Sequence, residues 1–297
     1  AGVPDVYPGL QGGLLDIALH PRFSENHWIY LSLSQGNDNA NSTKVIRGRY
    51  QHGRLDNVIE IFTASPHKKK TVHFGARMTF LPDETLLITV GDGFEYREDA
   101  QNLDSALGKI VRVTDNGQVP TDNPFLNQTN TRPEIWSYGH RHSQGIVYDA
   151  ITNNVYAHEH GPMGGDELNQ ILPGKNYGWP LATYGLDYSG AYVSPLQHYP
   201  GTEQPLVQWT PSLAPSGLTQ CRNCQWPEWE GDLLVGMLAG QQVRRIHFSD
   251  DATTTQEALF TELKTRVRDV RFGPDGALYL LMENSEGQVL KVTPKNG

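Results

Sequence analysis

Residues 76–90 read A-R-M-T-F-L-P-D-E-T-L-L-I-T-V, two short apolar runs joined by a Pro-Asp break. Short runs of apolar and β-branched residues bounded by Pro, Asp or Gly are typical of paired β-strands. Copies of this phrase cover residues 13–33, 76–92, 145–158, 216–236 and 270–281. Repetition at a spacing of roughly 50–70 residues predicts an all-β protein with a β-propeller architecture. A β-sandwich would give no reason for the phrase to repeat.

Further strand-like segments lie between the copies, for example at 44–50 and 109–113, and we interpret them as outer strands of the blades. Three long polar connections, at 35–43, 114–132 and 183–204, are predicted to be loops on one rim of the propeller. No segment has the composition of a linker, so the sequence predicts a single domain over residues 1–297.

Composition excludes several classes of function. Hydrophobic residues make up 37% and charged residues 19% of the chain, enough to build a core. A net charge of −9 argues against nucleic-acid binding, and the one basic run, 68–70, is interpreted as a solvated loop. No apolar run is long enough to cross a bilayer, and the chain does not open on a signal peptide. Cys221 and Cys224 could form a local disulfide or remain two free thiols.

The stretch 158–180, H-E-H-G-P-M-G-G-D-E-L-N-Q-I-L-P-G-K-N-Y-G-W-P, is the strongest candidate for a functional loop. Proline has no N–H, so a Gly161-Pro162 turn leaves carbonyl oxygens beside Asp166 and Glu167, and such oxygens are the ligands that Ca²⁺ prefers. The alternative is a tight surface turn with a solvated acidic pair. His158 and His160 could likewise be a metal pair, or could simply share one face of a strand.

In a propeller, equivalent positions of successive repeats converge on a common centre. Collected in this way, the candidate residues are Gln11, Asp16, His73, Arg77, Asp92, Arg141, His142, Gly161, Pro162, Asp166, Arg266 and Arg268. Together they provide one base, several carboxylates, a turn suited to a metal and several cations. This combination would suit an anionic cofactor held over Ca²⁺.

Several motifs follow one another in the order of a known family. They are V-H-F-G-A-R at 72–77, G-D-G at 91–93, Q-N-L-D-S-A-L-G-K-I at 101–110, G-H-R-H-S-Q-G at 139–145, E-H-G-P-M-G-G-D-E-L-N at 159–169 and P-G-K-N-Y-G-W-P at 173–180. Over essentially its whole length the chain resembles the soluble PQQ-dependent aldose sugar dehydrogenases of the glucose dehydrogenase type, a family of six-bladed propellers.

The resemblance implies a role for each matching position. His73 would take the proton from the anomeric hydroxyl of the sugar, Asp92 would orient that base, and Arg141 would act beside them. Cofactor contacts would come from Gln11, Arg141, His142, Asp166, Arg266 and Arg268. Gly161 and Pro162 would be carbonyl ligands of the Ca²⁺ under the cofactor, and Glu167 and Tyr177 would bind a second, structural Ca²⁺. The implied cofactors are thus PQQ and calcium.

The chain departs from the family pattern at four points. His142 stands where an asparagine is usual, Ala239 where a cofactor-contacting lysine is common, and Ala76 where a glycine is common. Arg244 or Arg245 could compensate for the missing lysine. The fourth departure is that the N-terminal repeat of the family is missing. We therefore expect only five of the six blades. A five-bladed relative, a truncated chain and a ring completed by homo-oligomer formation would each account for this.

The function expected from this resemblance is oxidation of aldose sugars at C1 to lactones, with electrons passed to an external acceptor. Family habit implies a periplasmic or secreted location. Two alternatives stay open at this point: a non-catalytic propeller that binds sugar or protein, and a Ca²⁺-dependent propeller lactonase. The clustered arginines suit a lactonase poorly.

Overall fold

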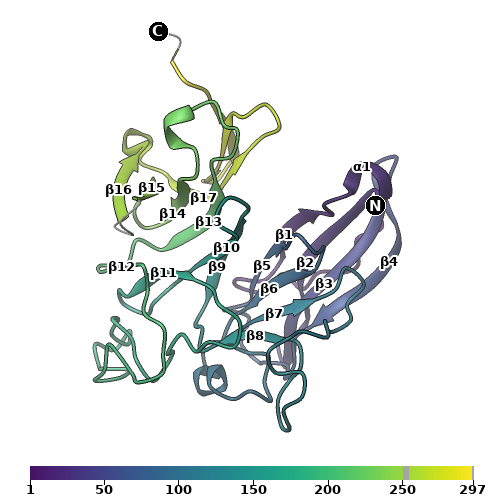
Figure 1. The fold of residues 1–297 in the computed structure, drawn as a ribbon, viewed down its shortest axis with the longest axis vertical. Helices are drawn as coiled ribbons and strands as arrows, with labels where there is room; N and C mark the ends of the chain where they lie inside the picture. Colours follow the sequence, from purple (N-terminus) through teal and green to yellow (C-terminus); the bar gives the residue numbers. More distant parts are fainter. Residues whose placement is uncertain (250–253, 296–297) are drawn as a thin grey trace. The chain divides into compact units, whose positions relative to one another are not determined.

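The structure, a computed structural model, describes residues 1–249 and 254–295 and consists of antiparallel β-sheets joined by turns (Figure 1). The chain divides into two units, which are described separately. Unit 1 comprises Ala1–Ser143, Ile171–Thr183 and Ser194–Gln204, and unit 2 comprises Gln144–Gln170, Tyr184–Val193 and the described part of Pro205–Gly297. The single domain expected from the sequence stays a prediction.

Unit 1 contains two four-stranded sheets, each with its strands in chain order. The first sheet consists of β1 (Leu14–Leu19), β2 (Trp28–Asn37), β3 (Ala40–Gln51) and β4 (Arg54–Thr63). The second consists of β5 (Gly75–Phe80), β6 (Leu86–Val90), β7 (Lys109–Val113) and β8 (Ile135–Tyr138).

Three sheets make up most of unit 2. The first consists of β9 (Ser143–Asp149), which begins at the boundary between the units, β10 (Asn154–Glu159), β11 (Asp166–Gln170) and β12 (Val207–Trp209). The second consists of β13 (Pro215–Gln220), β14 (Leu233–Met237), β15 (Gln242–Phe248) and β16 (Thr254–Leu259), and the third of β17 (Arg266–Phe272), β18 (Leu278–Glu283) and β19 (Gln288–Val292).

Helices are confined to single turns in the described chain. They are α1 (Phe23–Asn26) and the 3-10 turns η1 (Arg97–Ala100), η2 (Pro227–Trp229) and η3 (Thr261–Leu263). Within residues 1–249 and 254–295, no helix has the length and apolar character needed to cross a membrane.

The predicted fold class, an all-β propeller with five blades visible, is confirmed. Each copy of the repeated phrase forms the first two strands of one sheet, and the segments at 44–50 and 109–113 fall in β3 and β7. The interpretation of 35–43 as a loop was wrong. Residues 35–37 and 40–42 continue the pairing of β2 with β3, so this segment is a hairpin whose turn is only Asp38 and Asn39.

The first strand of several sheets carries an irregularity in register. It lies between Leu14 and Asp16 in β1, between Gly75 and Met78 in β5, between Ser216 and Leu218 in β13 and between Val267 and Asp269 in β17. Such bulges bend a strand and re-aim its side chains, and they are frequent next to active sites. Ala76 lies in the bulge of β5 with φ of 71°, so the alanine that replaces the usual glycine occupies a strained left-handed conformation.

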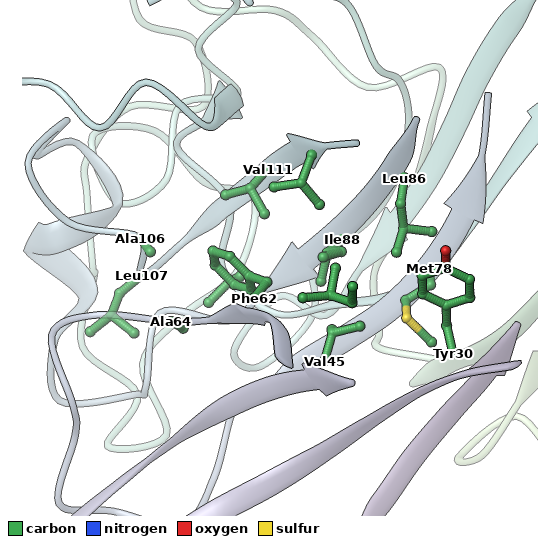
Figure 2. Packing of buried hydrophobic residues seen from close by; sticks show 13 residues of the cluster. Tyr30, Val45, Phe62, Ala64, Met78, Leu86, Ile88, Ala106, Leu107 and Val111 are labelled. Carbon is green, nitrogen blue, oxygen red and sulfur yellow. The ribbon is translucent and has the colours of Figure 1, made fainter. Parts of the chain in front are cut away.

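The core of unit 1 lies between its two sheets (Figure 2). Tyr30, Val45 and Phe62 come from the first sheet and pack against residues of the second, among them Met78 and Ile88. Each fully buried apolar side chain contributes about 1.5–3 kcal/mol to the free energy of folding. The two sheets are therefore held face to face, and the ends of β5 and β6 are fixed on this base.

Cys221 and Cys224 form a disulfide, which decides between the two states left open by the sequence. Cys221 is fully buried and packs in a cluster with Trp226 and Trp229.

Candidate active site

A buried histidine–carboxylate pair lies in unit 1, where β5 begins and β6 ends. One residue separates His73 from the start of β5 and one separates Asp92 from the end of β6, and the pairing of Gly75 with Val90 brings the two positions together. His73 Nδ1 lies 2.7 Å from Asp92 Oδ1. The exposed fractions of the two residues are 5% and 0%.

Further donors fix the carboxylate of Asp92. The backbone N–H of Phe94 donates to Oδ1 over 2.8 Å, and Trp179 Nε1 donates to Oδ2 over 2.8 Å. An ionised carboxylate only accepts hydrogen bonds, so the Nδ1 of His73 carries the proton in this arrangement. The lone pair is then on Nε2, which makes that atom the one able to act as a base.

Backbone contacts hold His73 in an unusual conformation. Its φ is 52°, in the left-handed region, and its N–H donates to Gln11 Oε1 over 2.8 Å. A Cβ at Gly91 would lie 2.2 Å from the His73 carbonyl oxygen, so glycine is required where β6 passes this residue. Strained residues held by their surroundings are frequent at functional sites.

The surroundings of His73 favour its neutral form. Burial is the largest cause of the lowering of its pKa, and the positive charges of Arg141 and Lys68 act in the same direction. The hydrogen bond and the charge of Asp92 oppose this shift. The ordinary pKa of a histidine is about 6.5. A histidine whose pKa lies below this value is mostly neutral at pH 7 and can accept a proton.

Aromatic rings enclose the imidazole. The ring of His142 stacks on His73 with centroids 4.4 Å apart and an interplanar angle of 13°, and Phe94 meets it edge-on at 5.3 Å. The guanidinium of Arg141 lies 5.3 Å from the centre of the Trp179 ring. Unit 1 thus gathers five residues singled out in the sequence, namely Gln11, His73, Asp92, Arg141 and His142.

Sequence reasoning missed Trp179 and Phe94 as parts of this site. Trp179 lies in the P-G-K-N-Y-G-W-P motif, which was noted without a role for its tryptophan. Phe94 follows G-D-G directly, but nothing in its type signals a contact with a base. Asp16 and Arg77 form a buried ion pair with 3.6 Å between Oδ1 and Nη1, and Asp16 Oδ2 accepts the N–H of Met78; a role for either residue in the site stays a prediction.

In unit 2, Asp166 is the centre of the glycine-rich loop. Its Oδ1 accepts the N–H of Gly161 over 3.0 Å, and its Oδ2 accepts the Ser212 hydroxyl and the N–H groups of Leu213 and Ala214 over 2.7–2.9 Å. The residue is fully buried. Asp166 therefore ties the 161–165 turn to the 212–214 segment, and a cofactor contact from it stays a prediction.

The Gly161-Pro162 turn is buried and crowded by carbonyl groups. A Cβ at Gly161 would lie 2.1 Å from the carbonyl oxygen of Gly164 and 2.5 Å from that of Gly165. Backbone oxygens therefore gather where only glycine fits, as expected of a site for a hard cation.

A second concentration of negative charge lies on β10 and β11. Glu159 and Glu167 are register partners on these strands. Burial, and next the charge of Glu159, raise the pKa of Glu167 to about 8, although the hydrogen bond from Asn169 opposes the shift. No set of three or more His, Cys, Asp or Glu side chains suited to a metal occurs in residues 1–249 and 254–295. Calcium here would need backbone oxygens as well.

Other predicted residues have partners of their own. Arg266 and Arg268 on β17 both form ion pairs with Glu283 of β18, and Arg268 NH1 also lies 3.4 Å from Ser216 Oγ. Tyr177 belongs to unit 1, where its hydroxyl accepts the N–H of Leu172 over 2.8 Å and its ring stacks on His140.

Arg245, named above with Arg244 as a possible substitute for the lysine at position 239, is paired with two carboxylates. Its Nε pairs with Asp232 at 2.6 Å and its NH1 with Glu257 at 2.8 Å. His160 Nε2, proposed above as part of a metal pair, lies 2.6 Å from the carbonyl oxygen of Pro215, to which it can donate.

The fold is an all-β propeller with a buried histidine base, and its relatives are sugar dehydrogenases, a class of oxidoreductase. The sequence model of the Glucose / Sorbosone dehydrogenase family matches residues 1–291, and the chain belongs to this family. Aldose sugar dehydrogenase YliI of Escherichia coli (strain K12) is 41% identical over 301 aligned positions, which cover 100% of this chain and 81% of the relative.

Solved structures agree. A crystal structure of glucose dehydrogenase superposes with a TM-score of 0.95 at 42% identity, covering 99% of this chain and 86% of the other. The PQQ-bound form of aldose sugar dehydrogenase from Streptomyces coelicolor gives a TM-score of 0.78 at 28% identity, covering 97% and 82%.

Proposed function

We propose that this protein oxidises aldose sugars at C1 to lactones with PQQ and Ca²⁺ and passes the electrons to an external acceptor. The observation that carries the proposal is the His73–Asp92 pair, in which a buried carboxylate leaves His73 Nε2 as a neutral base. The names of the relatives support the substrate class, and the PQQ-bound relative supports the cofactor.

The residues of each unit fit an anionic cofactor. PQQ carries three carboxylates, and arginine is the side chain best suited to bind carboxylates. We assign PQQ contacts to Arg141, Arg266 and Arg268, and further polar contacts to Gln11, His142 and Asp166. Arg266 and Arg268 share the single carboxylate of Glu283, which leaves this pair with a surplus of positive charge for an acidic ligand.

The crowded carbonyl oxygens at Gly161–Gly165 fit calcium. We assign Gly161 and Pro162 to the Ca²⁺ at the cofactor and Glu167 to a structural Ca²⁺, whereas a part for Tyr177 in calcium binding stays a prediction. When bound, Ca²⁺ supplies Lewis-acid polarisation and PQQ supplies a quinone that accepts two electrons.

The chain itself supplies binding, orientation and proton transfer. Asp92 keeps the proton on Nδ1 of His73, so that Nε2 takes the proton of the anomeric hydroxyl as C1 is oxidised. The positive charge that appears on the imidazole lies 2.7 Å from the carboxylate of Asp92 and is stabilised by it. Phe94 and Trp179 hold that carboxylate in place. The ordered base favours the enzyme over a binding-only propeller.

A periplasmic or secreted location is proposed as well. The Cys221–Cys224 disulfide supports it, because disulfides persist mainly in oxidising compartments. No acceptor and no oligomeric state is assigned, and the homo-oligomer expected as one alternative stays a prediction.

The proposed function is tested by titrating the purified protein with PQQ, with and without Ca²⁺, and following the absorbance of the quinone. Addition of glucose with a reducible dye then reports turnover. Ca²⁺-dependent binding followed by sugar-driven dye reduction is the expected result. Absence of PQQ binding at any Ca²⁺ concentration would overturn the proposal.

Calcium is expected to stabilise the protein through Glu167. A ligand at one hundred times its Kd stabilises a protein by about 2.7 kcal/mol, which raises Tm by several degrees. Burial and the charge of Glu159 disfavour the ionised form of Glu167, and Glu167→Gln removes this unfavourable group. Without Ca²⁺, the variant should therefore have a higher Tm than the wild type. On addition of Ca²⁺, its Tm should rise by less than that of the wild type.

Thermal unfolding with chelator and with increasing Ca²⁺ measures both effects. Glu257→Gln is the matched control, because Glu257 is an exposed carboxylate paired with Arg245. Equal rises of Tm in the two variants would show that Glu167 is not a ligand.

A further inference from the structure

The lysine run 68–70 is only partly the solvated loop predicted from the sequence, because Lys69 and Lys70 are exposed but Lys68 is buried. Lys68 has an exposed fraction of 2%, and its Nζ donates to Asn41 Oδ1 over 2.8 Å and to the carbonyl oxygen of Lys70 over 2.6 Å. Its backbone pairs with that of Asn41 in both directions, over 2.9 and 2.8 Å. Lys68 is therefore a fixed, buried side chain, since both its main chain and its ammonium group have partners.

Lys68 contacts the residues that follow both members of the catalytic pair. Its Nζ lies 3.5 Å from the centre of the Phe74 ring, next to His73 in sequence. The aliphatic part of its side chain packs against Gly93, which follows Asp92 in sequence. A Cβ added at Gly93 would lie 2.8 Å from Lys68 Cδ. One side chain thus packs against the two chain segments that hold the base and its carboxylate.

The neighbouring lysines extend this contact along the same loop. The N–H of Lys69 donates to the hydroxyl of Tyr96 over 3.3 Å. Lys70 Nζ pairs with Glu95 at 2.7 Å and lies 4.9 Å from the centre of the Phe94 ring, the ring that meets His73 edge-on. Residues 68–70 therefore pack along the loop that contains Asp92, Gly93 and Phe94.

The charges of this group are coupled. Burial lowers the pKa of Lys68 to about 7, and the negative charge of Asp92 opposes the shift. At His73, the charges of Arg141 and Lys68 lower the pKa, whereas Asp92 raises it. The titratable and charged groups around the imidazole are thus Asp92, Lys68, Arg141 and the stacked His142.

We propose that Lys68 is a positioning residue that fixes His73 against Asp92 and whose positive charge keeps the imidazole in its neutral, proton-accepting form. The catalytic role of His73 rests on the proposed function, but the coupling between the two side chains does not. It can be measured in the protein without PQQ.

The test is an NMR pH titration of protein with isotope-labelled histidine, in which His73→Gln assigns the His73 signal. In Lys68→Met, the titration midpoint of His73 should rise, because a nearby positive charge is lost. Lys68→Arg keeps the charge and should leave the midpoint near the wild-type value. A midpoint that is unchanged in Lys68→Met, or that rises equally in both variants, overturns the proposal.

Lys109→Met is the matched control. Lys109 is the second buried lysine whose pKa burial lowers to about 7, and its Nζ donates to the carbonyl oxygens of Asp99, Ala100 and Leu107. Its charge is not among those that act on His73. This variant should lose stability and leave the His73 midpoint unchanged, and a comparable rise would count against a specific role for Lys68.

Should Lys68→Met fail to fold, Asn41→Ala provides the measurement. It removes the side-chain acceptor of the Lys68 ammonium and so disfavours the charged form. The His73 midpoint should again rise, and an unchanged midpoint would contradict the proposal.

Steady-state kinetics separates this inference from the proposed function. In an active enzyme, the acid limb of kcat/KM, which reports the free enzyme, should move to higher pH in Lys68→Met by the amount found by NMR. An NMR shift in a protein that does not oxidise sugar supports the role of Lys68 and overturns only the proposed function.

Discussion

Replacement of His73 by alanine should lower kcat for sugar oxidation by about 10²–10⁴-fold, the usual contribution of a positioned general base. The side chain is buried, donates to Asp92 and stacks on His142. Its removal takes away the proton acceptor but none of the arginines assigned to PQQ. PQQ affinity should therefore stay within a few fold of the wild type, so that the loss falls on kcat.

The matched control is His247→Ala. His247 forms a second histidine–carboxylate pair, with Nδ1 2.7 Å from Asp232 Oδ1, but it lies in unit 2 on β15 and is half-exposed. Dye-reduction kinetics should show near-normal kcat in this variant. A kcat in His73→Ala within tenfold of the wild type, with PQQ bound, would show that another group removes the proton.

The pH dependence of the wild type follows from the same residue. The neutral form of His73 is the active one, and its pKa lies below the ordinary value of about 6.5 because of burial. kcat/KM, which reports the free enzyme, should therefore be insensitive to pH near 7 and fall only as the pH drops through the lowered pKa. The same shift makes folding less favourable at acid pH, because the unfolded chain takes up this proton before the folded chain does.

The sequence was sufficient for the parts of the fold that repeat. Alternating apolar runs and turn residues located the first two strands of every sheet, because local propensity and burial agree there. The extent of the 35–43 hairpin was missed, since its polar residues are paired through the backbone alone, which leaves no apolar pattern.

For the candidate site, the residue types with distinctive chemistry could be named in advance. His73 and Asp92 were selected, and the structure places them in contact. The burial of Lys68 could not be predicted, because a run of three lysines is normally solvated and the acceptor of its ammonium group, Asn41, lies 27 positions away in the chain. Trp179 was missed for a related reason. Its hydrogen bond to Asp92 spans 87 positions, and nothing local signals it.

Asp92→Asn should reduce kcat by about 10⁴-fold, as loss of the orienting carboxylate does in other acid–base systems, with little change in the shape of the side chain. The wild-type carboxylate accepts hydrogen bonds at both oxygens, from His73 and Phe94 at Oδ1 and from Trp179 at Oδ2. A carboxamide has one acceptor and one donor group. In the variant, the NH₂ group of the amide must therefore occupy either the Oδ1 or the Oδ2 position, where it faces an N–H donor.

Each orientation of the amide has a distinct consequence. With nitrogen at the Oδ1 position, the amide donates to His73 Nδ1, the imidazole proton moves to Nε2, and the base is lost. With nitrogen at the Oδ2 position, it opposes the N–H of Trp179, which leaves a buried donor unpaired at a cost of about 1–3 kcal/mol. The first orientation instead opposes the backbone N–H of Phe94, so each orientation leaves one donor unpaired, and the fall in kcat depends on how far the first orientation, with the wrong tautomer, is populated. NMR of labelled histidine reports that tautomer directly.

A second substitution distinguishes this account from a simple loss of charge. Trp179→Phe removes the N–H that opposes the amide, so in Asp92→Asn/Trp179→Phe the amide nitrogen can take the Oδ2 position and the oxygen can again accept from His73 Nδ1. The double variant should therefore have a higher kcat than Asp92→Asn, although Trp179→Phe alone lowers kcat by loosening Asp92. Asp232→Asn, at the other histidine–carboxylate pair, should leave kcat unchanged. If the double variant is no faster than Asp92→Asn, the negative charge of Asp92 rather than its control of the tautomer is what catalysis requires.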